Sequence, residues 1–194
     1  MTDKSSYTRP QGQKRWRVKP NNNKSFQVYV ACLASYNAGK LFGKWIDITD
    51  AESVDEVHEE ISEMLSQSPQ PGAEEWRIDD TEYLPGGLGL EGMVSFALAV
   101  ADHGQQNREA LAMLLDCGAA IEDLSAEFSA RYKGSWEDGV DFAEDHAEQH
   151  GLIREKANEL ERHIDWKSYA RELLSDGFWG CRGASGKFHV FASS

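Results

Sequence analysis

The first clear hydrophobic pattern in the chain is an alternation that begins near residue 25 and predicts a β-strand. Phe26, Val28, Val30 and Cys32 are separated by single intervening residues, which is the period of a strand buried on one face. Turn-forming residues follow at 37–39, and residues 41–48 are again rich in apolar and β-branched side chains. This order predicts two strands joined by a turn.

A helical period then replaces the alternation. Apolar residues recur at spacings of three and four and would form one stripe on a helix: Val54, Val57, Ile61, Met64 and Leu65. We expect this helix to begin near Thr49, since Thr49 and Glu52 have the spacing of a capping box, and to end at 68–69, where a proline follows a serine. Residues 75–78 favour a third strand.

The middle of the chain is predicted to be helical. The glycine-rich stretch 85–89 is a break in the pattern. Helical periods follow over 93–101, 108–116 and 121–131, separated by single glycines. Short helices with short connections indicate a compact helical region.

The last part of the chain again combines helix and strand. A second break is expected at 133–135, followed by an acidic helix whose start is capped by Ser135 or Asp138. A further helix at 166–174 and a terminal strand at 188–191 complete the pattern.

These elements predict the α+β fold class, with three small subdomains after an N-terminal tail. The expected segments are a basic flexible tail (1–24), an N-terminal α+β subdomain (25–84), a helical subdomain (85–132) and a C-terminal α+β subdomain (133–194).

Charge restricts the partners of such a chain. Its formal net charge is −13, but residues 1–24 hold seven basic residues and one acidic residue. The other 170 residues hold 13 basic and 32 acidic side chains, a net charge of −19. This body would be repelled by nucleic acids and anionic membranes and attracted to basic grooves, which are commonest in nucleic-acid-binding proteins. The same charge can also serve solubility alone.

The cysteines indicate a reducing compartment. The three cysteines are widely spaced and include no Cys-x-x-Cys pair, which argues against a disulfide framework or a structural zinc site. No apolar run approaches 18 residues, and no signal-peptide pattern follows the basic N-terminus. We therefore expect a soluble, cytoplasmic protein.

Two short motifs have the spacing of chemical sites but lack the context. Residues 87–92 match Gly-x-Gly-x-x-Gly, yet an acidic segment broken by Pro85 precedes them, so we interpret them as a hinge between subdomains. His146 and His150 have metal-ligand spacing without an evident third ligand, so we interpret them as a solvated pair. No nucleophile elbow, phosphate loop or triad is found. We expect no enzyme activity, no cofactor and no metal.

Several stretches of the sequence resemble the ArdA antirestriction family. Residues 28–39 followed by Gly-Lys-Trp-Ile-Asp at 43–47 look like that family's opening strand, Tyr-Asn turn and Gly-x-Trp-Ile-Asp return strand. The match continues in order through the acidic helix and residues 73–80. Supporting segments are 132–144, 164–173 and 189–191. The basic tail departs from the family pattern.

The resemblance implies an elongated protein that is similar to bent duplex DNA in shape and charge. It implies a homodimer that occupies the DNA groove of type I restriction-modification enzymes, carried by plasmids, transposons or phages. The charge agrees with this: two bodies would together carry about −38, roughly the charge of 19 base pairs.

Carboxylates at helical spacings of three and four lie roughly 5–6 Å apart, close to the spacing of phosphates along a strand. Asp55, Glu59 and Glu63 form one such row, and Asp138, Asp141 and Asp145 form a second. The whole candidate partner-binding surface comprises Asp55, Glu56, Glu59, Glu60, Glu63, Glu74, Glu75, Asp79, Asp80, Glu122, Asp123, Glu127, Glu137, Asp138, Asp141, Glu144, Asp145 and Glu148.

Three other functions remain open at this point. An acidic module that inhibits another DNA-binding protein predicts the same charge without a preference for type I enzymes. A small hydrolase or metalloenzyme using His146 and His150 predicts bound metal. A direct DNA binder using residues 1–24 predicts that deleting them removes DNA retention, and this can coexist with antirestriction.

Overall fold

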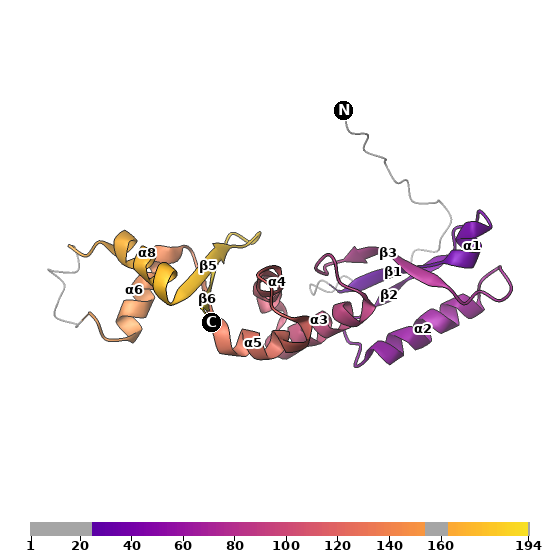
Figure 1. The fold of residues 1–194 in the computed structure, drawn as a ribbon, viewed down its shortest axis with the longest axis horizontal. Coiled ribbons are helices and arrows are strands. Elements are labelled where there is room, and N and C mark those ends of the chain that lie inside the picture. Colours follow the sequence, from indigo (N-terminus) through magenta and orange to yellow (C-terminus); the bar gives the residue numbers. More distant parts are fainter. Residues whose placement is uncertain (1–24, 154–162, 194) are drawn as a thin grey trace, which may run out of the picture.

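The computed structural model describes residues 25–153 and 163–193, so the expected tail of residues 1–24 lies outside the described chain. The described chain is elongated, and helices separate two three-stranded sheets (Figure 1). This confirms the predicted α+β class. The division into three subdomains stays a prediction, because one buried hydrophobic cluster runs from Phe26 through the central helices to Phe191.

The N-terminal sheet has the strand order β2-β1-β3, and both pairs are antiparallel. The strands are β1 (Gln27–Cys32), β2 (Gly43–Asp47) and β3 (Trp76–Glu82). The predicted alternation is confirmed, because Phe26, Val28, Val30 and Cys32 are completely buried. Two features were not expected: a short helix α1 (Leu33–Asn37) follows β1 directly, and β3 is longer than the four residues predicted.

Helix α2 (Val54–Ser66) packs its apolar stripe on this sheet, with Val57, Ile61, Met64 and Leu65 buried. Its predicted start was wrong. The Oγ1 atom of Thr49 accepts a hydrogen bond from the backbone of Phe26 at 2.8 Å and caps no helix.

The observed N-cap of α2 is Ser53, four residues further on, in a variant of the capping box in which Glu56 bonds the residue before the cap. Ser53 Oγ accepts from the Glu56 backbone at 3.4 Å, and the Glu56 carboxylate accepts from the Glu52 backbone at 3.0 Å. The sequence therefore contains two overlapping capping patterns. Ser53 caps the helix, whereas the Thr49 side chain bonds the backbone of Phe26, just before β1.

The three predicted central helices are confirmed. They are α3 (Leu90–His103), α4 (Arg108–Asp116) and α5 (Leu124–Arg131), with short 3₁₀ turns η1 (Gln105–Asn107) and η2 (Ile121–Asp123) before the last two. Gly104 and Gly118 end the first two helices with φ of +90° and +97°, a conformation that glycine adopts without strain.

The C-terminal sheet has the order β4-β6-β5 and is also antiparallel. Its elements are β4 (Tyr132–Trp136), α6 (Gly139–Gln149), α8 (Trp166–Asp176), β5 (Phe178–Arg182) and β6 (Phe188–Ala192). The predicted helix at 166–174 and terminal strand are confirmed, and strand β5 was missed.

The break predicted at 133–135 was wrong, because these residues belong to β4. Gly134 has φ of +140° where the register of β4 against β6 shifts, so the glycine marks a bulge within a strand. The acidic helix consequently starts at Gly139, and its cap is Asp138, not Ser135.

A partly buried polar network fastens the central helices to the second sheet. The Glu109 carboxylate of α4 accepts hydrogen bonds from the Ser185 backbone at 3.0 Å and His189 Nε2 at 3.1 Å. His189 is 4% exposed, and its Nδ1 lies 3.1 Å from the hydroxyl of Tyr132. Burial by itself would raise the pKa of Glu109, but the hydrogen bonds from Ser185 and His189 outweigh it and lower the pKa.

Candidate acidic interaction surface

The outward face of α2 carries a row of unpaired carboxylates. Asp55, Glu59 and Glu63 are exposed, because the buried apolar stripe of α2 faces the sheet and these residues lie on the other side of the helix. Among the described residues, none of these three carboxylates has a hydrogen-bond or ion-pair partner. Their neighbours Glu56 and Glu60 are engaged, the first by the capping box and the second by Lys44 at 2.9 Å. The three carboxylates of the first row thus lie unpaired on one exposed face of α2, and their role in binding a partner stays a prediction.

The second predicted row does not form, because Asp138 precedes α6. Its Oδ1 accepts hydrogen bonds from the backbones of Val140 and Asp141 at 2.8 and 3.1 Å. Asp145 is also engaged: its Oδ2 accepts from Trp136 Nε1 at 3.2 Å and Gln149 Nε2 at 2.9 Å. Periodicity could not reveal these internal roles.

Three more of the predicted surface carboxylates are neutralised by ion pairs. Glu127 pairs with Arg131 at 2.8 Å, Asp79 with Arg77, and Glu137 with Lys187. The Lys187 ammonium holds the pKa of Glu137 below its usual value. Exposed candidates that lack an ion pair in the described chain are, besides the α2 row and Glu56, Glu74, Glu75, Asp80, Glu122, Asp123, Asp141, Glu144 and Glu148.

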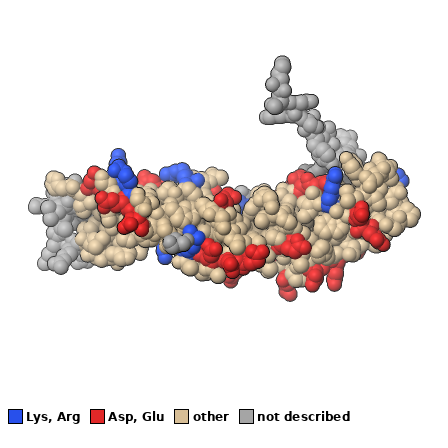
Figure 2. All heavy atoms as spheres, in the orientation of Figure 1, with Lys and Arg blue, Asp and Glu red and all other residues tan. Residues whose placement is uncertain are grey.

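Negative charge is concentrated toward the N-terminal end. Residues 25–84 contain 13 acidic and 3 basic residues, whereas residues 133–194 contain 12 acidic and 8 basic residues. Figure 2 shows acidic side chains gathered along the edge where α2 and α5 lie, with more basic side chains toward the C-terminal half. The described surface is thus an acidic band that weakens along the molecule.

Sequence periodicity missed several acidic residues that the fold adds to this band. Asp50, Glu52, Glu82, Glu91 and Asp102 are all exposed. They lie on turns, a strand end and helix ends, where no regular spacing marks them. Their common signal is only the excess of acidic over basic residues.

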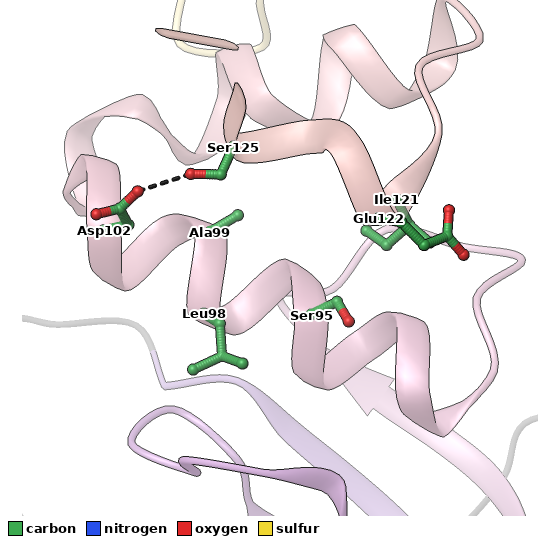
Figure 3. A pocket seen from close by; sticks show the side chains of 7 residues that line it. All are labelled: Ser95, Leu98, Ala99, Asp102, Ile121, Glu122 and Ser125. Atoms are coloured by element: carbon green, nitrogen blue, oxygen red, sulfur yellow. Dashed lines mark hydrogen bonds between the residues drawn. The ribbon is translucent and has the colours of Figure 1, made fainter. Parts of the chain in front are cut away.

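A shallow hollow of about 290 Å³ lies between α3 and α5 (Figure 3). Its lining includes the carboxylates of Asp102 and Glu122, and none of its lining residues is basic. The Ser125 hydroxyl donates a hydrogen bond to Asp102 at 2.6 Å. Because the lining carries two carboxylates and no basic side chain to balance a phosphate, the hollow extends the acidic surface.

The glycine motif at 87–92 also lacks the fold that dinucleotide binding requires. The strand before it, β3, pairs antiparallel with β1, and every strand pair in the described sheets is antiparallel. A dinucleotide site needs parallel strands joined by a helix.

The His146–His150 pair is more embedded than predicted. The two rings stack with centroids 4.1 Å apart, and His146 Nδ1 lies 3.1 Å from the Tyr169 hydroxyl of α8. Burial, followed by the charge of His150, lowers the pKa of His146. The described residues contain no group of three His, Cys, Asp or Glu arranged to hold a metal ion. His146 therefore helps to join α6 to α8.

In the described ranges, no helix has the length and apolar character needed to cross a membrane.

Comparison with known families gives a match over most of the chain. A family model described as "Antirestriction protein (ArdA)" matches residues 28–180, from β1 to the middle of β5. Among curated proteins, none matches the chain. The family match covers the N-terminal sheet, the acidic helix α2, the central helices and β4, and it ends before β6. The chain therefore belongs to the ArdA family of antirestriction proteins.

Proposed function

We propose that this protein inhibits type I restriction-modification enzymes by occupying their DNA-binding groove, without catalysing a reaction. The observation that carries the proposal is the unpaired row of Asp55, Glu59 and Glu63 on a rigid helix. Carboxylates held at roughly 5–6 Å spacing offer a basic groove regularly placed anions. Because no lysine or arginine of the described chain pairs with these carboxylates, they can pair with lysine and arginine side chains of a target without breaking an existing ion pair.

The elongated outline and the acidic band support the same mechanism. A DNA groove is long and lined by cations, so a partner must present charge over an extended surface. Acidic side chains on α2, on the loop before β3 and around α5 extend along the described chain. The protein would compete with DNA by mass action in the cytoplasm, where restriction takes place.

We further propose that two copies associate, as the family resemblance implies. Leu152 after α6 and Ile164 before α8 are exposed to 63% and 37%, and we propose them as contacts with the second copy. Sedimentation equilibrium should give twice the 21.7 kDa mass of the chain. A monomer mass at micromolar concentration would contradict this part of the proposal.

The main test is competition on a purified type I enzyme that holds labelled cognate DNA. The protein is titrated at low and high salt, and both DNA release and ATP-dependent cleavage are followed. We expect stoichiometric release that weakens as salt rises, because the contacts are electrostatic.

A matched pair of variants separates specific from general charge effects. Asp55→Asn/Glu59→Gln/Glu63→Gln should raise the midpoint of release about tenfold, at roughly 0.5 kcal/mol per lost charge contact. The control Asp116→Asn/Glu172→Gln/Asp176→Asn removes as many exposed charges outside the candidate surface and should change it less than threefold. If the folded protein releases no DNA at large excess, the type I target is wrong, and a different basic DNA-binding protein becomes the candidate target.

A further inference from the structure

The N-terminal sheet has a second face, directed away from its core, with a composition unlike that of the α2 surface. Side chains of directly paired residues share a face. Tyr29 of β1 is paired with Trp45 of β2 and with Asp80 of β3, and Gln27 is paired with Glu82. We call these five residues the outer face. The core side of the same strands carries Val28, Val30 and Ile46, all buried.

Two aromatic rings form the centre of the outer face. The rings of Tyr29 and Trp45 contact each other with centroids 5.4 Å apart, and neither belongs to the hydrophobic core or to the partly buried residues packed against it. The end of the Tyr29 ring lies over Gly43, where an added Cβ would come within 2.9 Å of it. Gly43 therefore leaves room for the tyrosine ring to lie across β2.

Carboxylates border these rings on one side. Asp80 and Glu82 are exposed on the edge strand β3. An aromatic surface beside carboxylates favours arginine, because a guanidinium can stack on a ring and pair with a carboxylate at once. The described chain already contains such a contact nearby, where the Arg77 guanidinium lies 4.6 Å from the centre of the Tyr36 ring and pairs with Asp79.

We infer that the basic segment of residues 1–24 docks on the outer face of its own N-terminal sheet. The segment has seven basic residues and includes the run Arg15-Trp16-Arg17, and its last residue, Lys24, lies three positions before Gln27 of the outer face. Its chemistry complements both the rings and the bordering carboxylates.

Length and charge both permit this contact. Nine residues lie between Arg17 and Gln27, and when extended they span roughly 30 Å, which is enough to bring Arg17 back to the paired rings. Residues 25–84 carry ten more acidic than basic residues, which attracts a segment of opposite charge. The docked segment would screen the sheet from other basic partners; only this regulatory consequence rests on the proposed antirestriction function.

The experiment measures the contact without any restriction enzyme. A fluorescent peptide with the sequence of residues 1–24 is titrated into two full-length proteins, the wild type and the variant Lys14→Gln/Arg15→Gln/Arg17→Gln/Lys19→Gln. Tethering gives an effective concentration of about 1 mM. If the free peptide binds at about 0.1 mM, we expect the wild type to bind it about tenfold more weakly than the variant, because its own segment competes.

Further substitutions in the variant background locate the docking site. Asp80→Asn/Glu82→Gln should weaken peptide binding about tenfold, and Trp45→Ala should do the same by removing a ring. The control Glu122→Gln/Asp123→Asn removes two equally exposed charges on η2 and should change binding less than twofold.

Three results would overturn the inference. Equal binding of the peptide to wild type and variant would show that the segment does not compete in cis. An equal loss in the η2 control would show general attraction without a site. If the wild type binds duplex DNA as strongly as the free peptide does, the segment is not held on the sheet and is a DNA-binding arm.

Discussion

The two sheets of this protein have the same architecture and nearly the same number of acidic residues, but they use them differently. Each is a three-stranded antiparallel sheet with an acidic helix nearby, α2 in one case and α6 in the other. In the N-terminal region, Asp55, Glu59 and Glu63 are unpaired. In the C-terminal region, Glu137 pairs with Lys187 and Asp138 caps α6. Asp141, Glu144 and Glu148 of α6 are exposed without an ion pair in the described chain, but residues 133–194 also contain eight basic residues. Acidity of sequence is thus a poor measure of the charge that a surface can offer to a partner.

The largest difference between the two regions should appear when the charges on α2 and on α6 are reversed in separate variants. Asp55→Lys/Glu59→Lys/Glu63→Lys exchanges three attractions for three repulsions, a loss of about 3 kcal/mol in binding to a type I enzyme. The protein concentration at the midpoint of DNA release should therefore rise roughly 100-fold. Asp141→Lys/Glu144→Lys/Glu148→Lys on α6 should cost about tenfold or less, because basic residues already dilute the charge of that region. Circular dichroism checks that both helices persist. Equal losses would mean that the weaker charge of the C-terminal region makes no difference to binding.

Breaking the Glu109 network should destabilise one end of the molecule. Glu109→Ala leaves the buried His189 Nε2 without its acceptor, a cost of about 2 kcal/mol in the free energy of unfolding. Glu91→Ala, on the exposed side of α3, should change stability by less than about 0.5 kcal/mol. Urea unfolding measures both values.

Hydrogen exchange on the Glu109→Ala variant then shows where the loss falls. We expect amides of β5 and β6 to lose protection before those of β1. Equal loss in both sheets would instead indicate that the continuous hydrophobic core makes them unfold as one unit.

The caps of α2 and α6 differ in geometry and should differ in strength. Asp138 accepts two backbone hydrogen bonds, at 2.8 and 3.1 Å, whereas Ser53 accepts one, at 3.4 Å. We therefore expect Asp138→Ala to cost about 1 kcal/mol and Ser53→Ala about 0.5 kcal/mol of unfolding free energy. Thermal unfolding of the two variants decides this. The reverse order would show that the Glu56 half of the α2 capping box matters more than the serine.

Mild acid should open the C-terminal region locally, which is the smallest effect we expect. The pKa of His146 is lowered in the folded protein, so below the ordinary value of 6.5 the unfolded state takes up a proton more readily. Stability present at neutral pH is then lost as the pH falls through the window just below 6.5. Hydrogen exchange at pH 7.5 and 5.5, corrected for intrinsic rates, should show lost protection in α6 and α8 but not in β1. His146→Gln should remove the difference.

Much of the fold follows from local periodicity. The alternation in β1, the stripe of α2 and the boundaries of α4 were all predictable, because each buries one face of a regular element. Strands β4 and β5 were not, because Gly134 and Gly180 suggest loops in sequence. In the structure Gly134 forms a bulge, and a Cβ at Gly180 would come within 2.7 Å of the Phe188 ring. Such glycines are required by neighbours that lie far away in the sequence.

The candidate surface was predictable only in part for the same reason. The α2 row depends on one helix and its own spacing. The neutralisation of Glu137 by Lys187 joins residues fifty positions apart, and the hydrogen bond that Glu109 accepts from Ser185 reaches a turn 76 residues away. Sequence shows how many carboxylates a region has, and the fold decides which of them are already engaged.

Strand β3 has a consequence for the solubility of the protein. It is an edge strand, so one side of its backbone is open to pairing with the edge of another molecule, a common route to aggregation. Asp80 and Glu82 give that edge a net negative charge, since Arg77 neutralises only Asp79, and this charge repels the same edge of a second copy. The carboxylates that would attract a basic partner thus also keep like molecules from joining sheet to sheet, and neutralising them for a binding experiment should be accompanied by a check for turbidity.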